Sequence, residues 1–267
     1  MDHNTIKLVA VDEDGTFLRD HVHYDIERFE RVWQLMQRRG VRFVVATGNQ
    51  CYQVQNLFPA HTLEMGIVSA NGAYVLDGTQ EVYAAQASQE AVSLMIDAVH
   101  AMPEVPFSML GVAGAYVERG TSTEFFDDMA RYCHRQYWVD SFDDVDDQIF
   151  MFSSVVDARE VGACIERFRD IVGSRMDVVG SGDGYFDVVC PGVSKATGLQ
   201  TLLDRWGIAP SECVAFGDSD NDLAMLELVG TSYAMDNAPQ NVKDAAGHVA
   251  PSCVDDGVLV VLEELLG

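Results

Sequence analysis

Two carboxylates stand one residue apart near the start of the chain, directly after an apolar run. Residues 8–11 are Leu-Val-Ala-Val, and Asp12, Glu13 and Asp14 follow before a Gly-Thr turn pair. Side chains two residues apart in a strand point to the same side, so Asp12 and Asp14 would meet beyond its end. Burying two like charges together is unfavourable unless a cation joins them. The spacing is typical of phosphate chemistry, although an acidic turn after a strand has the same pattern.

Other polar residues stand where further buried strands end or where helices begin. Ligands of open α/β sheets bind at the carboxyl ends of the strands, where these residues would gather. Carboxylates there suit Mg²⁺, whereas a threonine hydroxyl and a lysine ammonium suit phosphate oxygens. Each residue alone also fits an ordinary role at a strand end or in the first turn of a helix. The set consists of Thr47, Lys195, Asp218, Asn221 and Asp222.

The elements that must carry these residues follow from the apolar periodicity. Asp25 can cap a helical pattern that ends at Gly40, and the apolar run 41–46 comes next. Two continuously apolar strands joined by a helix predict a parallel sheet with a right-handed crossover. A strand at 66–69 and a hairpin at 73–84 extend it. The carboxyl-terminal part repeats the alternation, with helices expected at 194–206, 223–228, 239–246 and 256–266 and strands at 213–216, 233–235 and 248–250.

The stretch between the hairpin and Pro191 differs from both flanks, because amphipathic helices alternate there with short strands. This pattern predicts a separate α+β module. Its helices are expected at 89–102, 123–136 and 158–172, and its strands at 107–110, 115–118, 149–156, 176–179 and 185–189.

Length and charge limit the class of protein. The 267 residues, 48% of them hydrophobic, can bury a sizeable core, and we expect two domains. Acidic residues number 42 against 17 basic ones, and the formal charge of −25 disfavours nucleic acid and anionic membranes as partners. A phosphate substrate would therefore need local positive charge from a metal, a lysine or helix amino termini.

Cysteine usage and hydropathy bear on location. The six cysteines have no zinc or Cys-x-x-Cys spacing, which indicates structural thiols in a reducing compartment. The first residues contain no basic leader, and no apolar run reaches transmembrane length. We therefore expect a soluble cytoplasmic protein.

The polar residues, in this order, resemble the haloacid dehalogenase (HAD) superfamily of phosphotransferases, and more closely its Cof-type group with a type IIB cap between the second and third motifs. The likeness covers the whole chain. Each motif is weak alone, but the ordered set is highly specific. The motifs are Asp12-Glu13-Asp14-Gly15-Thr16, Ala46-Thr47-Gly48, Gly192-Val193-Ser194-Lys195 and Gly217 to Asp222, with two further stretches at 69–73 and 234–238.

The resemblance implies an α/β fold, a Rossmann-like parallel-sheet core (HAD fold) with an inserted α+β cap domain. The core would comprise residues 1–83 and 191–267, and the cap residues 84–190. The cap would close over the site, exclude water and select the leaving group. The cap residues that are candidates to face the substrate are Tyr185 and Phe186, followed by Glu118 and Arg119.

By the same resemblance Asp12 would be the nucleophile that forms an aspartyl-phosphate, and it would also bind Mg²⁺. Asp14 would be the general acid and base, and its backbone carbonyl could reach the metal. Asp218 would be a direct metal ligand, and Asp222 a supporting residue that orients Lys195 or a metal-bound water. The phosphoryl group would be held by the backbone N–H groups of Glu13 and Gly48 and by Thr47, Lys195 and Asn221.

One residue departs from the family pattern. Asn49 stands where many relatives carry arginine after the Thr-Gly pair, so the site would hold less positive charge. The contact that such an arginine would make with a second substrate anion is therefore in doubt. His21 and His23 follow the first motif without metal spacing, and we expect them in a surface loop.

The resemblance implies a Mg²⁺-dependent phosphatase that acts on a small phosphorylated metabolite such as a sugar, polyol or cofactor phosphate. A hexose-phosphate phosphomutase is an alternative, because capped relatives share the aspartyl-phosphate chemistry. A phospho-acceptor signalling domain is a second alternative, since such domains also gather acidic residues, a threonine and a lysine on an α/β edge. The roughly hundred-residue insert is large for a signalling domain of that kind.

Overall fold

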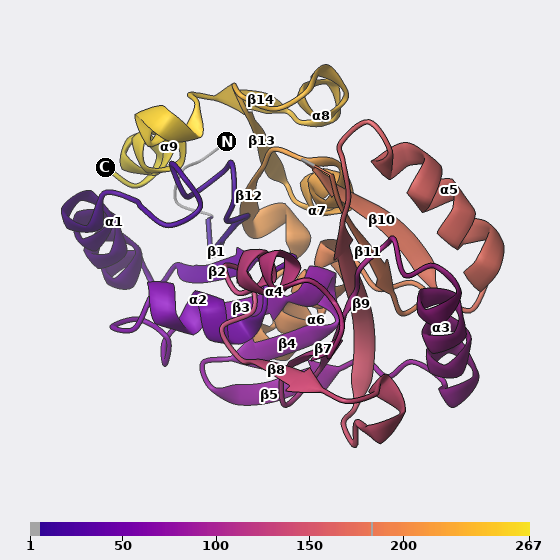
Figure 1. The fold of residues 1–267 in the computed structure, drawn as a ribbon. Coiled ribbons are helices and arrows are strands. Elements are labelled where there is room, and N and C mark those ends of the chain that lie inside the picture. The colour runs from indigo at the N-terminus through magenta and orange to yellow at the C-terminus, as the bar shows by residue number, and fades with distance from the viewer. Residues whose placement is uncertain (1–5, 183) are drawn as a thin grey trace.

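The computed structural model describes residues 6–182 and 184–267, which form two sheets with helices packed against them (Figure 1). The larger sheet contains β1 (Leu8–Val11), β2 (Arg42–Ala46), β3 (Gly66–Ser69), β4 (Tyr74–Asp77), β5 (Gln80–Ala84), β12 (Cys213–Gly217), β13 (Thr231–Met235) and β14 (His248–Ala250). Its strand order is β14-β13-β12-β1-β2-β3-β4-β5. The first six strands of that order are parallel, and β4 and β5 form an antiparallel edge.

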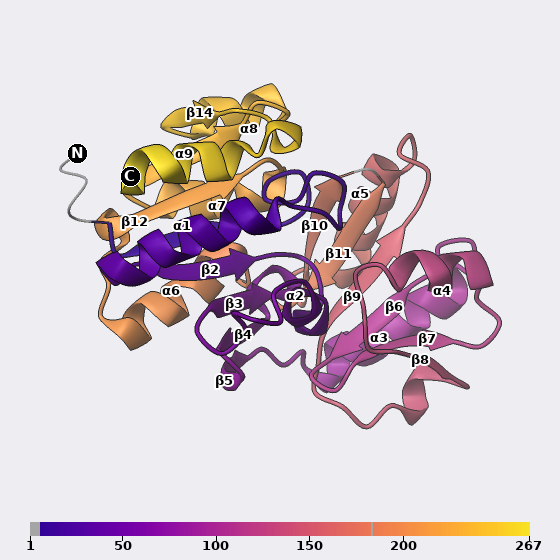
Figure 2. The same ribbon diagram turned by 90° about the vertical axis from the view of Figure 1, so that its left-hand side faces the viewer.

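Two layers of helices cover this sheet (Figure 2). The odd-numbered residues of β1 share an apolar cluster with α1 (Ile26–Arg39) and α9 (Gly257–Leu266). Its even-numbered residues face α6 (Lys195–Trp206) and α7 (Leu223–Leu228) on the other side. Because both faces are buried, these strands are continuously apolar in sequence. The remaining helices of the two layers are α2 (Cys51–Leu57) and α8 (Gln240–Ala245).

The second sheet lies between β5 and α6 in the sequence and forms the cap. It consists of β6 (Ser108–Gly111), β7 (Ala115–Glu118), β8 (Gln136–Val139), β9 (Ile149–Val155), β10 (Asp177–Gly182) and β11 (Tyr185–Val189) in the order β10-β11-β9-β6-β7-β8. The strands β7 and β8 pair in parallel, and the other neighbouring strands pair antiparallel. The helices of the cap are α3 (Gln89–Ala101), α4 (Thr123–Met129) and α5 (Val161–Val172). A parallel α/β core with an inserted α+β cap confirms the predicted fold class.

The structure differs from the predicted elements in two places. The helix expected at 123–136 is wrong in its second half, because α4 ends at Met129 and residues 136–139 pair with β7 as the edge strand β8. Trp138 stacks on Phe126 with ring centroids 4.2 Å apart, so packing of the strand onto α4 overrides the helical spacing. Helix α2 is absent from the prediction, since its seven residues carry little periodicity and no side chain caps its start.

Two observations bear on location. The six cysteines are free thiols, five of them buried. Within residues 6–182 and 184–267, no helix is both long and apolar enough to cross a bilayer. The expectation that no leader precedes the first strand falls on residues 1–5, which lie outside the described residues.

Candidate active site

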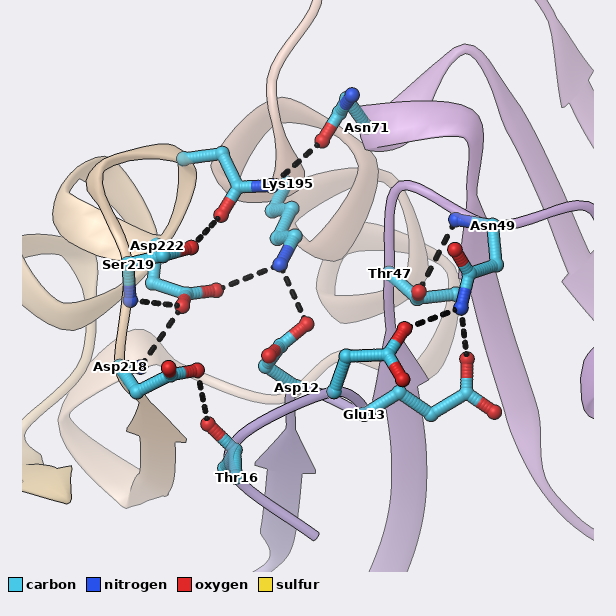
Figure 3. A network of polar contacts seen from close by, with 12 residues as sticks. Asp12, Glu13, Thr16, Thr47, Asn49, Asn71, Lys195, Asp218, Ser219 and Asp222 are labelled. Carbon is cyan, nitrogen blue, oxygen red and sulfur yellow. Dashed lines mark hydrogen bonds and ion pairs between the residues drawn. The ribbon is translucent and has the colours of Figure 1, made fainter. Parts of the chain in front are cut away.

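Three neighbouring strands and one helix bring the predicted residues together at the carboxyl edge of the larger sheet (Figure 3). Asp218, Asp12 and Thr47 directly follow β12, β1 and β2, which are adjacent in the sheet. Lys195 is the first residue of α6 and reaches this edge from one of the helix layers. Residues far apart in the sequence therefore meet around Asp12.

Lys195 joins two of the carboxylates. Its Nζ donates to Oδ1 of Asp12 at 2.6 Å and to Oδ1 of Asp222 at 2.7 Å, and all three residues are buried. The other oxygen of Asp222 accepts the backbone N–H groups of Asp218 and Ser219, at 2.9 and 3.0 Å. The side chain of Asp222 therefore binds both the ammonium group of Lys195 and the backbone of the loop after β12.

The start of α6 is fixed by its own sequence and by a neighbouring loop. The Ser194 hydroxyl accepts the N–H of Thr197, and the Thr197 hydroxyl accepts the N–H of Ser194, which forms a capping box. Gly72 has φ +97°, and a Cβ there would lie 2.1 Å from the carbonyl oxygen of Ser194. Only glycine allows the loop to lie this close, and the contact sets where Lys195 begins the helix.

Carboxylates outnumber cations at this point of the structure. Asp12, Asp218 and Asp222 each offer an oxygen within 4.8 Å of the others. Burial and the charge of Asp222 raise the pKa of Asp12 above its ordinary value although Lys195 opposes the shift, and the same two causes raise the pKa of Asp218 to about 6. Burial lowers the pKa of Lys195, but the two flanking carboxylates outweigh it and raise the pKa overall. A charged lysine therefore leaves an excess of buried carboxylates, and such an oxygen-rich site fits a divalent cation such as Mg²⁺.

Asp14 is held at both of its carboxylate oxygens. Asn49 Nδ2 donates to Oδ2 at 2.7 Å, and His21 Nδ1 lies 2.9 Å from Oδ1. His21 is exposed, as expected for a surface loop, but its contact with Asp14 was not predicted, because nothing in the sequence says how the loop folds back. Asp14 itself is partly exposed, so a substrate can reach it.

Glu13 is a second carboxylate that contacts the side chain of Asn49. The amide of Asn49 also donates to Glu13 Oε2 at 3.2 Å, and its backbone N–H donates to the Thr47 hydroxyl at 3.0 Å. Burial, followed by the charge of Asp14, raises the pKa of Glu13 to about 8. The side chain of Glu13 therefore belongs to the inner support of the site, while its backbone runs beside Asp12.

A chain of hydrogen bonds connects the loop after β12 to the cap. Asn221 Nδ2 donates to Asn71 Oδ1 at 3.1 Å, and Asn71 Nδ2 donates to Asp187 Oδ2 at 2.8 Å. The Ser153 hydroxyl donates to the other oxygen of Asp187 at 2.7 Å. Asn71 has φ +55°, a conformation that asparagine tolerates better than most residues. The role of Asp187 was missed, since a lone aspartate within a strand carries no sequence signal.

A second contact between core and cap begins at the residue after Asn49. Gln50 donates through its backbone N–H to Tyr132 O at 3.0 Å and through Nε2 to Arg135 O at 3.0 Å, and its Oε1 accepts the N–H of Arg135 at 2.7 Å. The Arg135 guanidinium lies 3.6 Å from the ring centroid of Tyr52. This contact, which we call the clasp (Gln50 and Tyr52 with Tyr132 and Arg135), was also missed, because it depends on how the cap docks.

A cleft of about 660 Å³ lies between core and cap and includes Asp14 and Asp218 in its lining. Of the cap residues named as candidates, Tyr185 lines the cleft. Phe186, on the opposite side of β11, is buried and packs against the rings of Phe107 and Phe168 in the cap. Glu118 and Arg119 are not among the described residues that line the cleft; they contact His100 and Asp140.

Comparisons with known proteins identify the family to which the chain belongs. The family model of haloacid dehalogenase-like hydrolases matches residues 9–262. The chain is 37% identical over 262 residues to the 5-amino-6-(5-phospho-D-ribitylamino)uracil phosphatase YbjI of Escherichia coli, which covers 98% of this chain and 97% of that protein. The crystal structure of SMU.1108c from Streptococcus mutans has a TM-score of 0.92 at 32% identity and covers 98% of this chain and 99% of its own. The subclass IIB sugar phosphatase BT4131 shares the fold, with a TM-score of 0.82 at 21% identity over 97% of this chain and 98% of its own.

The matches extend over both the core and the cap rather than over one of them. The order of the motifs and the topology of the two sheets agree with the same assignment. The chain therefore belongs to the haloacid dehalogenase-like hydrolases, and within them to the Cof-type phosphatases with a type IIB cap.

Proposed function

We propose that the protein is a Mg²⁺-dependent phosphatase that hydrolyses small phosphomonoesters through an aspartyl-phosphate on Asp12. The observation that carries this proposal is the position of Asp12, which is hydrogen-bonded to Lys195 and adjoins Asp218, while Asp14 lines the cleft. In this proposal residues 1–83 and 191–267 perform the chemistry, and residues 84–190 act as the cap.

The proposed metal site consists of the carboxylates of Asp12 and Asp218 and the backbone carbonyl of Asp14. The excess of buried carboxylates supports this assignment, because hard oxygen ligands are those that Mg²⁺ prefers. Bound Mg²⁺ would reduce the repulsion between these carboxylates and an incoming phosphate and stabilise negative charge on the phosphoryl oxygens. The hydroxyl of Thr16 donates to Asp218 Oδ1 at 2.8 Å and keeps that ligand oriented.

In the first step a carboxylate oxygen of Asp12 attacks phosphorus, and the bond to the leaving alcohol breaks. Protonated Asp14 donates its proton to the departing oxygen. Its two contacts suit this task, since Asn49 donates to one oxygen and His21 Nδ1 can accept from, or donate to, the other as the proton moves. In the second step a water molecule attacks phosphorus, Asp14 takes its proton, and inorganic phosphate leaves Asp12.

The transferring phosphoryl group requires donors on its equatorial oxygens. We assign this role to the backbone N–H groups of Glu13 and Gly48 and to the side chains of Thr47, Lys195 and Asn221. Lys195 is held beside Asp12 by Asp222, so its charge is in place before a substrate arrives. This preorganisation is consistent with a role of Asp222 in orienting Lys195 rather than in contacting the substrate.

The substrate we propose is a small phosphorylated metabolite, a sugar, polyol or cofactor phosphate. The name of the Escherichia coli relative specifies 5-amino-6-(5-phospho-D-ribitylamino)uracil, and we propose this ester and the simpler D-ribitol 5-phosphate as the first compounds to test. The cleft volume of about 660 Å³ is in the range of small-molecule sites.

We also propose a cytoplasmic location, which the six free thiols support.

The test measures inorganic phosphate released from both esters with Mg²⁺ and with a chelator in its place. We expect steady release in Mg²⁺, loss of release in the chelator, and loss in the variant Asp12→Asn, which retains the shape of the side chain but lacks the nucleophilic oxygen. Asp244→Asn, on the exposed surface of α8, serves as the matched control. Undiminished release by Asp12→Asn would contradict the mechanism. Isomerised ester with little free phosphate would favour the phosphomutase, and a long-lived phospho-Asp12 the signalling domain.

A further inference from the structure

The described residues in the wall of the cleft carry negative charge without a compensating lysine or arginine. Four carboxylates line it, namely those of Asp14, Asp187, Asp218 and Asp220. None of the described residues in its lining is a lysine or an arginine. Asp14 and Asp218 belong to the proposed catalytic centre, whereas Asp187 and Asp220 lie outside it, so the cleft is also acidic beyond the point where the phosphoryl group is transferred.

The ammonium group of Lys195 and the amide of Asn49 are already engaged inside the protein. Lys195 is 1% exposed and bonds to Asp12 and Asp222. The amide of Asn49 donates to Glu13 and Asp14, so it is directed inward. Mg²⁺ bound between Asp12 and Asp218 would be neutralised by those carboxylates and the transferring phosphoryl group. Among the described residues that line the cleft, no lysine or arginine is then left to bind a second anion, and His21 already contacts Asp14.

The cap half of the cleft is largely apolar, which strengthens the effect of charge. Met129, Met151, Val161 and Ile165 line it together with aromatic residues such as Tyr185. Between such walls the local dielectric is low, and like charges repel one another more strongly than in water. An anionic group on the leaving alcohol would face both the carboxylates and this poorly hydrated surface.

On the basis of the phosphatase function above, we propose that the cleft selects phosphomonoesters whose leaving alcohol carries no second anionic group. Esters of neutral polyols are accepted, and esters that carry a carboxylate or a second phosphate are rejected. The carboxylates that line the cleft, with no lysine or arginine among the described residues of its lining, determine this specificity. The rejection acts on the leaving group and is separate from the binding of the phosphoryl group.

The experiment compares D-ribitol 5-phosphate with 5-phospho-D-ribonate, in which the far hydroxymethyl group is replaced by a carboxylate. Both esters have the same carbon chain. We expect kcat/KM for the ribonate to be lower by about tenfold to hundredfold at low salt. The gap should narrow when the ionic strength is raised from about 20 mM to about 500 mM, because salt screens the repulsion.

A variant tests the cause of the preference. Ile165→Lys introduces a cation on α5 in the wall of the cleft, and we expect it to raise the ratio of kcat/KM for ribonate over ribitol phosphate about tenfold. Ile165→Met has a similar length without the charge and should leave the ratio as in the wild type. An unchanged ratio in a folded Ile165→Lys protein would contradict the role of charge.

The outcomes separate this inference from the phosphatase function. Equal kcat/KM for the two esters at low salt, with both activities abolished by Asp12→Asn, would overturn the inference and leave the phosphatase intact. If neither ester were hydrolysed, binding of the two to the wild type with Mg²⁺ would be compared by calorimetry. Tighter binding of the ribitol ester would then support the inference while contradicting the function, and equal binding would contradict both.

Discussion

At the scale of single residues, Asn49 connects several parts of the site. Its amide nitrogen donates to Glu13 and Asp14, and its backbone N–H donates to the Thr47 hydroxyl. A neutral donor between two carboxylates separates their charges and fixes the orientation of Asp14. Asn49 is therefore a positioning residue for the proposed acid and base rather than a gap left by a missing arginine.

We expect Asn49→Ala to lower kcat by about tenfold to hundredfold while changing KM by less than about threefold, because Asp14 loses its fixed orientation and the phosphoryl donors remain. Steady-state phosphate release from D-ribitol 5-phosphate measures both parameters. Gln34→Ala, an exposed position on α1, is the control and should retain wild-type values. A rise in KM alone would show that Asn49 contacts the substrate instead.

The residue scale also shows what the sequence can reveal about a site. The gathering of five polar residues at one edge of the sheet was predictable, because their types and order follow from the chemistry and from the ends of parallel strands. These residues are Asp12, Asp14, Thr47, Lys195 and Asp218. The contacts of His21 and Asn49 with Asp14 were not, since they depend on the path of two loops. A contact between two loops leaves no periodic pattern in the sequence.

At the scale of elements, the start of α6 determines where Lys195 lies. The capping box fixes the first turn of the helix, and Gly72 lets the loop after β3 lie against the carbonyl of Ser194. At its other end, α6 stops at Gly207, which has φ +64°, and a Cβ added there would meet no described atom within 4 Å. The two glycines thus share a positive φ but differ in the space around them.

This difference yields a paired prediction. Gly72→Ala forces a Cβ into the Ser194 carbonyl and should cost about 2–4 kcal/mol of unfolding free energy and reduce activity, because α6 must shift with Lys195. Gly207→Ala incurs only backbone strain, about 1 kcal/mol, and should leave kcat unchanged. Urea unfolding and phosphate release on both variants provide the measurements. Equal losses of stability and activity in the two would refute the steric argument.

Apolar periodicity predicts some of the helices and strands but misses others. Long apolar strands and capped helices such as α1 were recognised with their ends nearly correct, because burial on both faces and an Asp cap are local signals. The short helix α2 and the edge strand β8 were not recognised. Both are stabilised by neighbours, as the stacking of Trp138 on Phe126 illustrates, so their sequences alone are ambiguous.

At the scale of the whole molecule, two sets of hydrogen bonds join cap and core next to the cleft. Asn71 bonds to Asp187 of the cap, and the clasp joins Gln50 to the loop that carries Tyr132. Tyr132 lines the cleft, and Gln50 directly follows the residue that orients Asp14. The shape of the leaving-group space and the position of the acid and base therefore depend on the same segment of the core.

We expect Gln50→Ala to lower kcat/KM for D-ribitol 5-phosphate about tenfold, since the side-chain hydrogen bonds that dock the cap loop at Arg135 are lost. Acetyl phosphate, whose leaving group is too small to need the cap, should be affected less than about twofold. Gln34→Ala, on the exposed side of α1, is the control for the substitution itself. Parallel losses on both substrates would mean that Gln50 acts on the core chemistry and not on the cap.

The strand β1 lies in the middle of the larger sheet, between β2 and β12, which are far apart in the sequence. β2 starts at Arg42, whereas β12 starts only at Cys213. During synthesis on the ribosome, β1 can pair with β2 early, but its other edge remains open until the entire cap has emerged. Asp12 equally lacks Lys195 and Asp222 for that time. The nascent chain therefore exposes an edge of β1 that can pair with a wrong strand. The catalytic centre is among the last parts of the core to form.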